Sequence, residues 1–349
     1  MPSPLPSPSH DPAAPPRALR SAFLVGAPRC GTTFLAKLLA RHPEVCFSKP
    51  KETHFFVRDA PDIPPARWRE EFLRRHFGHH ASGEHLLIEG SPLQLRDPAA
   101  IRRLLQFDPE ARFVVALRSP IDMVQSLHAR LVFLLDEDER DLERAWALQG
   151  ARARGERLPR RCRDRGALQY RAMASLGSQL ERLYGEVDRK RVHVVVFDDL
   201  AADAAKTYLE LLAFLDLPDD GRRRFRPRNE SRRHRFDWLQ TALTHPPRPV
   251  AAWLAERERR GEPRPEWVRA LRRSVKRWNT IPEPRPALSP AMFGVLRSAL
   301  EDEVRRLEAL LGRDLSHWLS EDARTRFGRP PGLPGEDERR KPAGASARA

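Results

Sequence analysis

The sequence predicts an α/β fold in which a P-loop-type parallel sheet is flanked by helices on both faces and followed by a helical C-terminal part. Three observations lead to this fold class. Short apolar runs rich in β-branched residues alternate with helical stretches, a glycine-bracketed turn follows the first run, and the C-terminal region shows helical periodicity. Continuous apolar runs are typical of strands buried on both faces, and crossover helices between such strands make them parallel.

Four strands are expected, at Ala22–Val25, Leu86–Ile88, Phe113–Leu117 and Val192–Phe197. The segments between them are long enough for crossover helices. Near the C-terminus, apolar residues recur every three or four positions, which indicates a long helix. Its apolar positions are Phe293, Leu296, Leu300, Val304, Leu307 and Leu311, with Ser289 and Pro290 expected to begin the helix and Gly312 to end it. Between residues 240 and 288 we expect helices joined by extended connectors.

The 349 residues are enough for one large domain, which we place at residues 20–320, and no second domain boundary is visible. Residues 1–19 and 327–349 are rich in Pro, Gly, Ala and charge, and are predicted to be disordered tails. No stretch reaches 18 apolar residues, so no membrane span is expected.

The composition is strongly basic. The formal net charge is +15, and 56 of the 63 basic residues are Arg. Such a surface attracts phosphates, sulfates and anionic polymers, which agrees with an anionic cofactor. No RNA- or DNA-binding motif is present, so nucleic acid is not the expected partner. A non-catalytic binder of nucleic acid or anionic glycan stays an alternative.

The number and spacing of the cysteines bear on the cellular compartment of the protein. Cys30, Cys46 and Cys162 are odd in number, scattered and without metal-ligand spacing. This pattern predicts reduced thiols in a cytoplasmic protein. There is also no clustered Asp/His set, so no metal is required for the expected chemistry.

A phosphate-binding loop is predicted where the first strand meets the first helix, in Gly26-Ala27-Pro28-Arg29-Cys30-Gly31-Thr32-Thr33. Such a loop holds phosphate with backbone N–H groups and the positive end of the helix. The kinase pattern G-x-x-x-x-G-K-[ST] would place Lys at position 32, where this chain has Thr32. The cation of this loop is Arg29. The loop therefore favours a phosphate-like anion on a nucleotide, with a degenerate P-loop kinase or NTPase as an alternative.

The carboxyl ends of parallel strands lie at one edge of the sheet, and ligands bind there. We therefore expect the ends of two further strands beside this loop. Glu89-Gly90-Ser91-Pro92 follows the second predicted strand, and Arg118-Ser119-Pro120 follows the third. Ser126 lies about two turns into the next helix. A guanidinium and a hydroxyl that reach one phosphate would form a second anion site.

The phosphate loop and the segment around Arg118 and Ser126 resemble two motifs of the sulfotransferases that use PAPS (3′-phosphoadenosine 5′-phosphosulfate). Pro28–Thr33 resembles their 5′-phosphosulfate loop, and Leu117–Asp122 continuing to Ser126 is similar to their 3′-phosphate motif. The resemblance covers about residues 19–320, and bacterial members of the family are among the proteins that the chain resembles. It implies PAPS as cofactor and PAP (adenosine 3′,5′-bisphosphate) as product, held by Pro28, Arg29, Cys30, Gly31, Thr32, Thr33, Arg118 and Ser126.

A third segment, Lys51-Glu52-Thr53-His54-Phe55-Phe56, resembles a segment of the heparan sulfate O-sulfotransferases whose Glu is the catalytic base. Glu89–Pro92 looks like a Glu-Lys-Thr/Ser-Pro element of the same enzymes, but Gly90 replaces their Lys. Lys49, Lys51 and Arg29 are candidates to compensate. Asn229-Glu230-Ser231, within an Arg-rich run, also looks like a cofactor-covering loop of the superfamily.

The resemblance implies in-line transfer of a sulfuryl group to a hydroxyl, or an amine, of a carbohydrate, lipid or small-molecule acceptor. Arg29 and the loop N–H groups would stabilise the charge on the phosphate. Glu52 would take the acceptor's proton, and His54 would orient the acceptor or serve as an alternative base. Structural interpretations stay open: Glu52 as a solvated carboxylate, His54 as a packed histidine, Ser126 as an ordinary helix serine and Arg118 as a salt-bridge residue.

Overall fold

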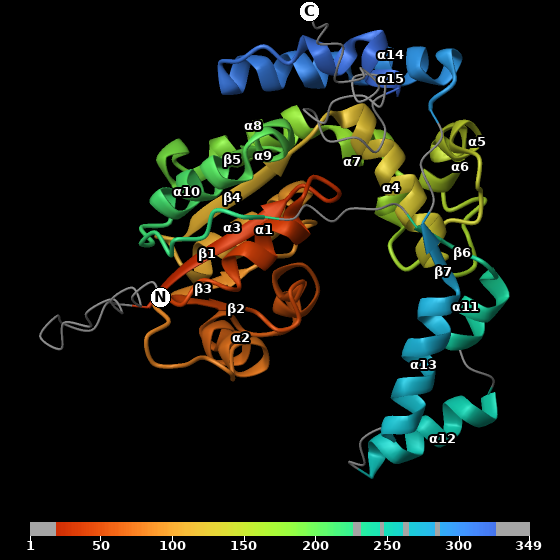
Figure 1. The fold of residues 1–349 in the computed structure, drawn as a ribbon, viewed down its shortest axis with the longest axis horizontal. Coiled ribbons are helices and arrows are strands. Elements are labelled where there is room, and N and C mark those ends of the chain that lie inside the picture. Colours follow the sequence, from red (N-terminus) through yellow and green to blue (C-terminus); the bar gives the residue numbers. More distant parts are fainter. Residues whose placement is uncertain (1–18, 226–231, 245–247, 261–264, 283–286, 326–349) are drawn as a thin grey trace, which may run out of the picture.

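A five-stranded parallel sheet lies at the centre of the fold, with helices on both faces (Figure 1). The structure is a computed structural model that describes residues 19–225, 232–244, 248–260, 265–282 and 287–325. The strands are β1 (Arg20–Gly26), β2 (Val45–Phe47), β3 (Leu86–Glu89), β4 (Arg112–Leu117) and β5 (Val192–Val196), in the order β2-β3-β1-β4-β5. The predicted fold class is confirmed.

All four predicted strands are present, and β2 is an additional edge strand. Three residues are too few to give a sequence signal, so tertiary pairing with β3 decides this strand. The prediction for the last strand was wrong by one residue, because Phe197 begins helix α9 (Phe197–Ala202). Asp198 and Asp199 lie in the first turn of α9, where the helix dipole stabilises negative charge.

Helices connect the strands and cover the sheet. In the first half of the chain they are α1 (Thr32–Leu39), α2 (Trp68–His76), α3 (Pro98–Phe107) and α4 (Pro120–Leu134). They are followed by α5 (Leu142–Ala147), α6 (Gln149–Ala153), α7 (Tyr170–Ala174), α8 (Leu176–Glu186), α9 and α10 (Ala204–Phe214). Short helical turns lie at Phe55–Asp59, Ala60–Asp62, Pro65–Arg67, Gln94–Arg96, Arg165–Leu168 and Arg189–Arg191.

The C-terminal helix is α14 (Pro290–Leu311), as predicted. The Ser289 side chain accepts a hydrogen bond from the Met292 N–H at 3.0 Å, and Gly312 ends the helix in the left-handed conformation. The predicted apolar positions face α8 and α4, which α14 contacts, and all but Leu311 are buried. A turn at Ser316–Leu319 and α15 (Glu321–Thr325) complete the described part.

The segment between β5 and α14 contains the arm, which we define as residues 232–282. It consists of β6 (Arg232–His234), α11 (Asp237–Thr244), α12 (Arg248–Arg259), α13 (Glu266–Trp278) and β7 (Thr280–Pro282). The helices were predicted, whereas the antiparallel β6–β7 pair was not. Figure 1 shows α11, α12 and α13 extending away from the sheet. Among the described helices, none is long and apolar enough to cross a membrane.

The two tails fall almost entirely outside the described residues, and so does Asn229–Ser231. The single domain at residues 20–320 stays a prediction.

The packing of α8 against α14 generates the first testable expectation. A Cβ atom at Gly177 would lie 2.6 Å from the backbone oxygen of Glu303 in α14. Gly177→Ala should therefore lower the free energy of unfolding by about 1–3 kcal/mol, because the two helices must separate. Gly185 in the same helix has no atom of the described residues within 4 Å of such a Cβ. Gly185→Ala should be neutral or stabilise by up to about 1 kcal/mol. Urea unfolding measures both, and equal effects would contradict this close packing.

Candidate functional site

The loop between β1 and α1 has the geometry of an anion site. Gly31 has a φ of 98°, in the left-handed region that favours glycine, and α1 begins directly after it. No side chain caps this helix, and its first turn contains no acidic residue. The Phe34 N–H donates to the Gly31 carbonyl at 2.9 Å, so the N–H groups of Thr32 and Thr33, with the positive end of the helix dipole, are the ones placed to contact an anion.

Arg29 joins this loop to α4. The Arg29 Nε donates a hydrogen bond to the Ser126 Oγ at 3.0 Å, although the two residues are 97 positions apart. Arg29 is half-buried and has positive φ, and Ser126 is buried. The structure thus brings together one residue from each of the two predicted phosphate motifs.

Arg118, at the end of β4, has different neighbours. Its Nη2 lies 2.7 Å from Asp122 Oδ2, four residues further along the chain, and its guanidinium lies 4.7 Å from the ring centroid of Phe197. Asp122 lies in the first turn of α4, whereas Arg118 precedes the helix, so the helical i,i+4 rule does not predict this pair. Arg118 and Ser126 therefore border the same edge of the sheet without bonding to each other in this structure.

The other loop residues divide by exposure. Thr33 is exposed and Pro28 half-buried, whereas Thr32 and Cys30 are buried. Burial raises the pKa of the Cys30 thiol to about 12, so this thiol stays protonated near neutral pH. A protonated thiol is a poor nucleophile. We therefore interpret Cys30 as a small residue that fits the turn and not as a reactive group.

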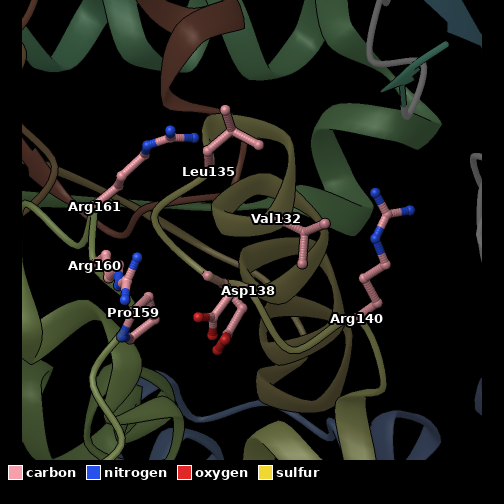
Figure 2. A pocket seen from close by; sticks show the side chains of 8 residues that line it. Val132, Leu135, Asp138, Arg140, Pro159, Arg160 and Arg161 are labelled. Carbon is pink, nitrogen blue, oxygen red and sulfur yellow. The ribbon is translucent and has the colours of Figure 1, made fainter. Parts of the chain in front are cut away.

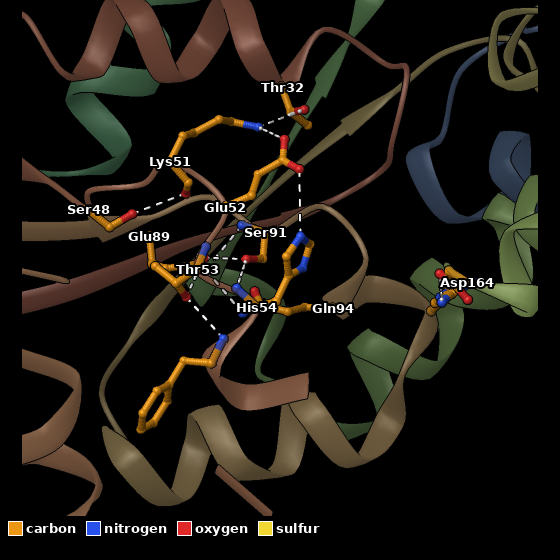
Figure 3. A network of polar contacts seen from close by, with 12 residues as sticks. Thr32, Ser48, Lys51, Glu52, Thr53, His54, Glu89, Ser91, Gln94 and Asp164 are labelled. Atoms are coloured by element: carbon orange, nitrogen blue, oxygen red, sulfur yellow. Dashed lines mark hydrogen bonds and ion pairs between the residues drawn. The ribbon is translucent and has the colours of Figure 1, made fainter. Parts of the chain in front are cut away.

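The Lys51–His54 segment lies next to the loop (Figure 3). The Lys51 Nζ is 3.4 Å from the Thr32 Oγ1 and 2.9 Å from a carboxylate oxygen of Glu52. Glu52 Oε2 lies 3.9 Å from the Nε2 of His54. An ammonium, a carboxylate and an imidazole therefore meet beside the N-terminus of α1.

Lys51 also occupies the space next to Gly90. A Cβ atom at Gly90 would lie 3.3 Å from the Cε of Lys51 and 3.0 Å from the ring of Phe47. A lysine at position 90 would compete with Lys51 for this space. Of the three residues considered for the missing lysine, Lys51 is thus the one whose side chain passes over Gly90 and reaches the loop.

A buried carboxylate holds this segment in place. Glu89 is 1% exposed and accepts hydrogen bonds from the N–H and hydroxyl of Thr53, both at 3.0 Å. It also accepts bonds from the N–H of Ser91 at 3.1 Å, from the Ser91 hydroxyl and from the amide of Gln94 at 3.0 Å. Burial raises the pKa of Glu89, and the bonds from Ser91 and Thr53 oppose that rise. Sequence analysis found Glu89 but missed these partners, whose only local signal is the Glu-x-Ser spacing.

His54 belongs to the same network. Its backbone N–H donates to the Ser91 Oγ at 2.9 Å, its φ is 54°, and its ring faces Glu52 (Figure 3). Burial, with a smaller contribution from Arg58, lowers the pKa of His54. The imidazole is therefore neutral near neutral pH, which allows one ring nitrogen to accept a proton.

A hollow of about 300 Å³ opens at the C-terminal end of α4 (Figure 2). Its polar lining includes Arg140, Arg160, Arg161, Glu137 and Asp138. None of the loop residues lines it. None of the Lys51–His54 residues lines it either.

Comparisons with known proteins agree with this geometry. A family model described as "Sulfotransferase family" matches residues 21–77, which contain the loop and the Lys51–His54 segment. No curated protein matches the chain. The resemblance to the sulfotransferase family is confirmed by this match and by the fold below, whereas no comparison confirms the closer resemblance to heparan sulfate O-sulfotransferases.

Three solved structures are similar to the chain. A sulfotransferase from Alicyclobacillus acidocaldarius is 23% identical with a TM-score of 0.59, over 87% of this chain and 100% of that chain. This likeness shows the fold. A sulfotransferase domain from the curacin biosynthetic pathway is 14% identical with a TM-score of 0.40, over 59% and 76% of the two chains. A sulfotransferase domain from a Synechococcus olefin synthase is 17% identical with a TM-score of 0.36, over 60% and 78%.

The Glu89 network generates the second testable expectation. Glu89→Gln replaces one acceptor oxygen by an NH₂ group that must face N–H and O–H donors. We expect the free energy of unfolding to fall by about 1–3 kcal/mol in urea titrations, because buried donors lose their acceptor. Glu70→Gln is the matched control, since the Glu70 side chain is 69% exposed, and its effect should stay within about 0.5 kcal/mol. A Glu89→Gln effect as small as that of the control would show that the network does not hold the segment.

Proposed function

We propose that this chain, which has the fold and an N-terminal segment of the sulfotransferase family, transfers the sulfuryl group of PAPS to an acceptor hydroxyl. The observation that carries the proposal is the meeting of three elements at one edge of the sheet. These are the uncapped N-terminus of α1, the Arg29–Ser126 hydrogen bond and the Lys51–Glu52 pair. Together they place donors for an anion next to a carboxylate that can accept a proton.

The residues present fit a nucleotide with two anionic ends. The loop from Pro28 to Thr33 would hold the 5′ end through its backbone N–H groups, with the Thr32 and Thr33 hydroxyls as additional donors. Arg118 and Ser126, at the end of β4 and in α4, would hold the 3′-phosphate. The contact between Arg29 and Ser126 supports two adjoining sites for one molecule.

PAPS, when bound, supplies a sulfuryl group on a good leaving group, so the protein must mainly position the acceptor and stabilise charge. Arg29 and Lys51 would stabilise negative charge at the loop. The Lys51 contact with the Thr32 hydroxyl places this ammonium where it can act there. Lys51 would then supply the cation that Gly90 does not.

Glu52 would accept the proton of the acceptor hydroxyl. Its side chain is 42% exposed and thus accessible to an acceptor, and Lys51 holds it beside the loop. His54, with its lowered pKa, would orient the acceptor or take the proton in place of Glu52. The proposed acceptor is a carbohydrate, a lipid or a small metabolite. The group that receives the sulfuryl group is a hydroxyl or, as an alternative, an amine. The cytoplasmic location predicted from the unpaired cysteines is part of the same proposal.

Binding of PAP tests the proposal against the kinase alternative. In thermal-shift measurements we expect PAP to stabilise the protein more than ATP with Mg²⁺, because position 32 lacks the lysine of the kinase loop. In calorimetry, Arg118→Ala should weaken PAP much more than adenosine 5′-phosphosulfate, which has no 3′-phosphate. Equal losses for both ligands would remove Arg118 as the 3′ contact, and stabilisation by ATP–Mg²⁺ alone would favour the kinase alternative.

Replacing Glu52 tests the proton acceptor. Glu52→Gln should leave PAP affinity nearly unchanged, while transfer of ³⁵S from PAPS to a responsive acceptor falls at least tenfold, since general-base catalysis contributes about 10²–10⁴-fold. Glu44→Gln is a control in the same stretch of the chain but outside the network. Unchanged turnover in Glu52→Gln would leave His54 as the base.

A further inference from the structure

The arm holds a large share of the basic charge and of the tryptophans. Residues 232–282 contain thirteen Lys and Arg and five Asp and Glu, a net charge of +8 out of +15 for the whole chain. Four of the seven Trp residues also lie there, at positions 238, 253, 267 and 278. Basic charge and aromatic surface are therefore concentrated together in about one seventh of the sequence.

Helix α13 separates these two properties onto opposite faces. Trp267, Leu271 and Trp278 fall within about 40° of one another at 3.6 residues per turn. Their exposed fractions are 68%, 57% and 56%, although large apolar side chains are usually buried. The other face carries five cations, Arg269, Arg272, Arg273, Lys276 and Arg277. Glu266 is the acidic residue of this helix.

Neighbouring elements of the arm extend the aromatic surface. The rings of Phe236 and Trp278 are stacked with centroids 6.0 Å apart, and Phe236 lies 6.2 Å from Trp238. Phe236 is 45% exposed and Trp238 is 68% exposed. Trp253 in α12 is exposed as well. Exposed aromatic side chains that cluster in this way mark an interaction surface.

The arrangement of charge around the aromatic face identifies the partner chemistry. A helix with tryptophan and leucine on one face and arginine and lysine on the other lies in the headgroup region of a bilayer. Tryptophan favours that region because one part of its ring is apolar and another is polar. Arg272 and Arg277 flank the apolar face, from which long side chains reach headgroup phosphates. A single-stranded nucleic acid site would place cations and aromatic rings on the same face. The cations of α13 lie opposite its rings, although the Arg235 guanidinium, from outside this helix, lies 5.6 Å from the centroid of Trp278, so DNA is included in the test below.

We propose that the arm docks this protein on the surface of a bilayer that contains anionic lipids. Trp267, Leu271 and Trp278 enter the headgroup region, and the cations of α13 contact lipid phosphates. This docking is interfacial and needs no helix that crosses the bilayer. The arm is attached to α4, because the His234 Nε2 donates to the Phe133 carbonyl at 2.9 Å and the two rings stack at 4.1 Å. The inference does not depend on the proposed transfer reaction.

Vesicle co-sedimentation of the full chain tests the docking. The protein should sediment with phosphatidylcholine vesicles that contain phosphatidylglycerol and much less with phosphatidylcholine alone. Binding should fall when salt rises from about 0.1 to about 0.5 M, because screening shortens the range of the charges. Trp267→Ser with Trp278→Ser should weaken binding at least tenfold. Arg272→Glu with Arg277→Glu should do the same, since each basic residue near such a surface contributes roughly a factor of five.

Matched controls come from outside the arm. Val295→Ser removes an apolar side chain of α14 that is 47% exposed, and Arg41→Glu with Arg297→Glu changes the net charge equally. Both controls should bind vesicles like the unchanged protein. The circular dichroism spectra of all variants should show the same helix content, because every substituted side chain is exposed, while loss of the Trp278 contact with Phe236 lowers the melting temperature of the tryptophan variant by a few degrees at most.

Four results would overturn the proposal. The first is absence of sedimentation with phosphatidylglycerol vesicles. The second is retention of binding in both arm variants, which would place the lipid contact elsewhere. The third is a dimer in sedimentation velocity that dissociates in Trp267→Ser with Trp278→Ser while vesicles fail to bind, which would make the aromatic face an interface between two copies. Binding to heparin or DNA without binding to vesicles would likewise replace the lipid surface by a soluble polyanion.

Discussion

The candidate site depends on the hydrogen bonds of one buried carboxylate, Glu89. A carboxylate in the interior is stable only when donors surround it, and here Thr53, Ser91 and Gln94 supply them. Because Thr53 follows Glu52, the network fixes the backbone on which Lys51, Glu52 and His54 stand. A turn that would otherwise be free to move thus becomes a rigid support for groups that need defined distances.

The parallel sheet provides the other constraint. Its strands end at a common edge, so the loop after β1, the turn after β3 and the start of α4 after β4 lie together although they are far apart in sequence. The hydrogen bond from Arg29 to Ser126 is the most direct sign of this convergence. The same topology lets Lys51 reach Thr32 and lie over Gly90, where a relative with lysine at that position would need a different arrangement.

Basic side chains occur in two different settings in this molecule. At the sheet edge, a few cations lie in defined contacts with acceptors, as Arg118 does with Asp122. On α13, by contrast, the cations share a face opposite exposed tryptophans. Fixed, partly buried cations suit recognition of one small anion, whereas an amphipathic helix suits an extended anionic surface.

The sequence by itself determined the four main strands, the turn between β1 and α1, and α14, because short apolar runs, a glycine-bracketed turn and helical periodicity are local signals. It also identified Arg29, Glu52, His54, Arg118 and Ser126 as candidate site residues, and it placed Glu89 at the end of a strand. Tertiary structure alone decided β2, since a three-residue strand exists only through its pairing with β3. It also decided that the Lys51 side chain lies next to Gly90 and which groups surround Glu89. Contacts between residues tens of positions apart arise from how the strands pack, and no local pattern encodes them.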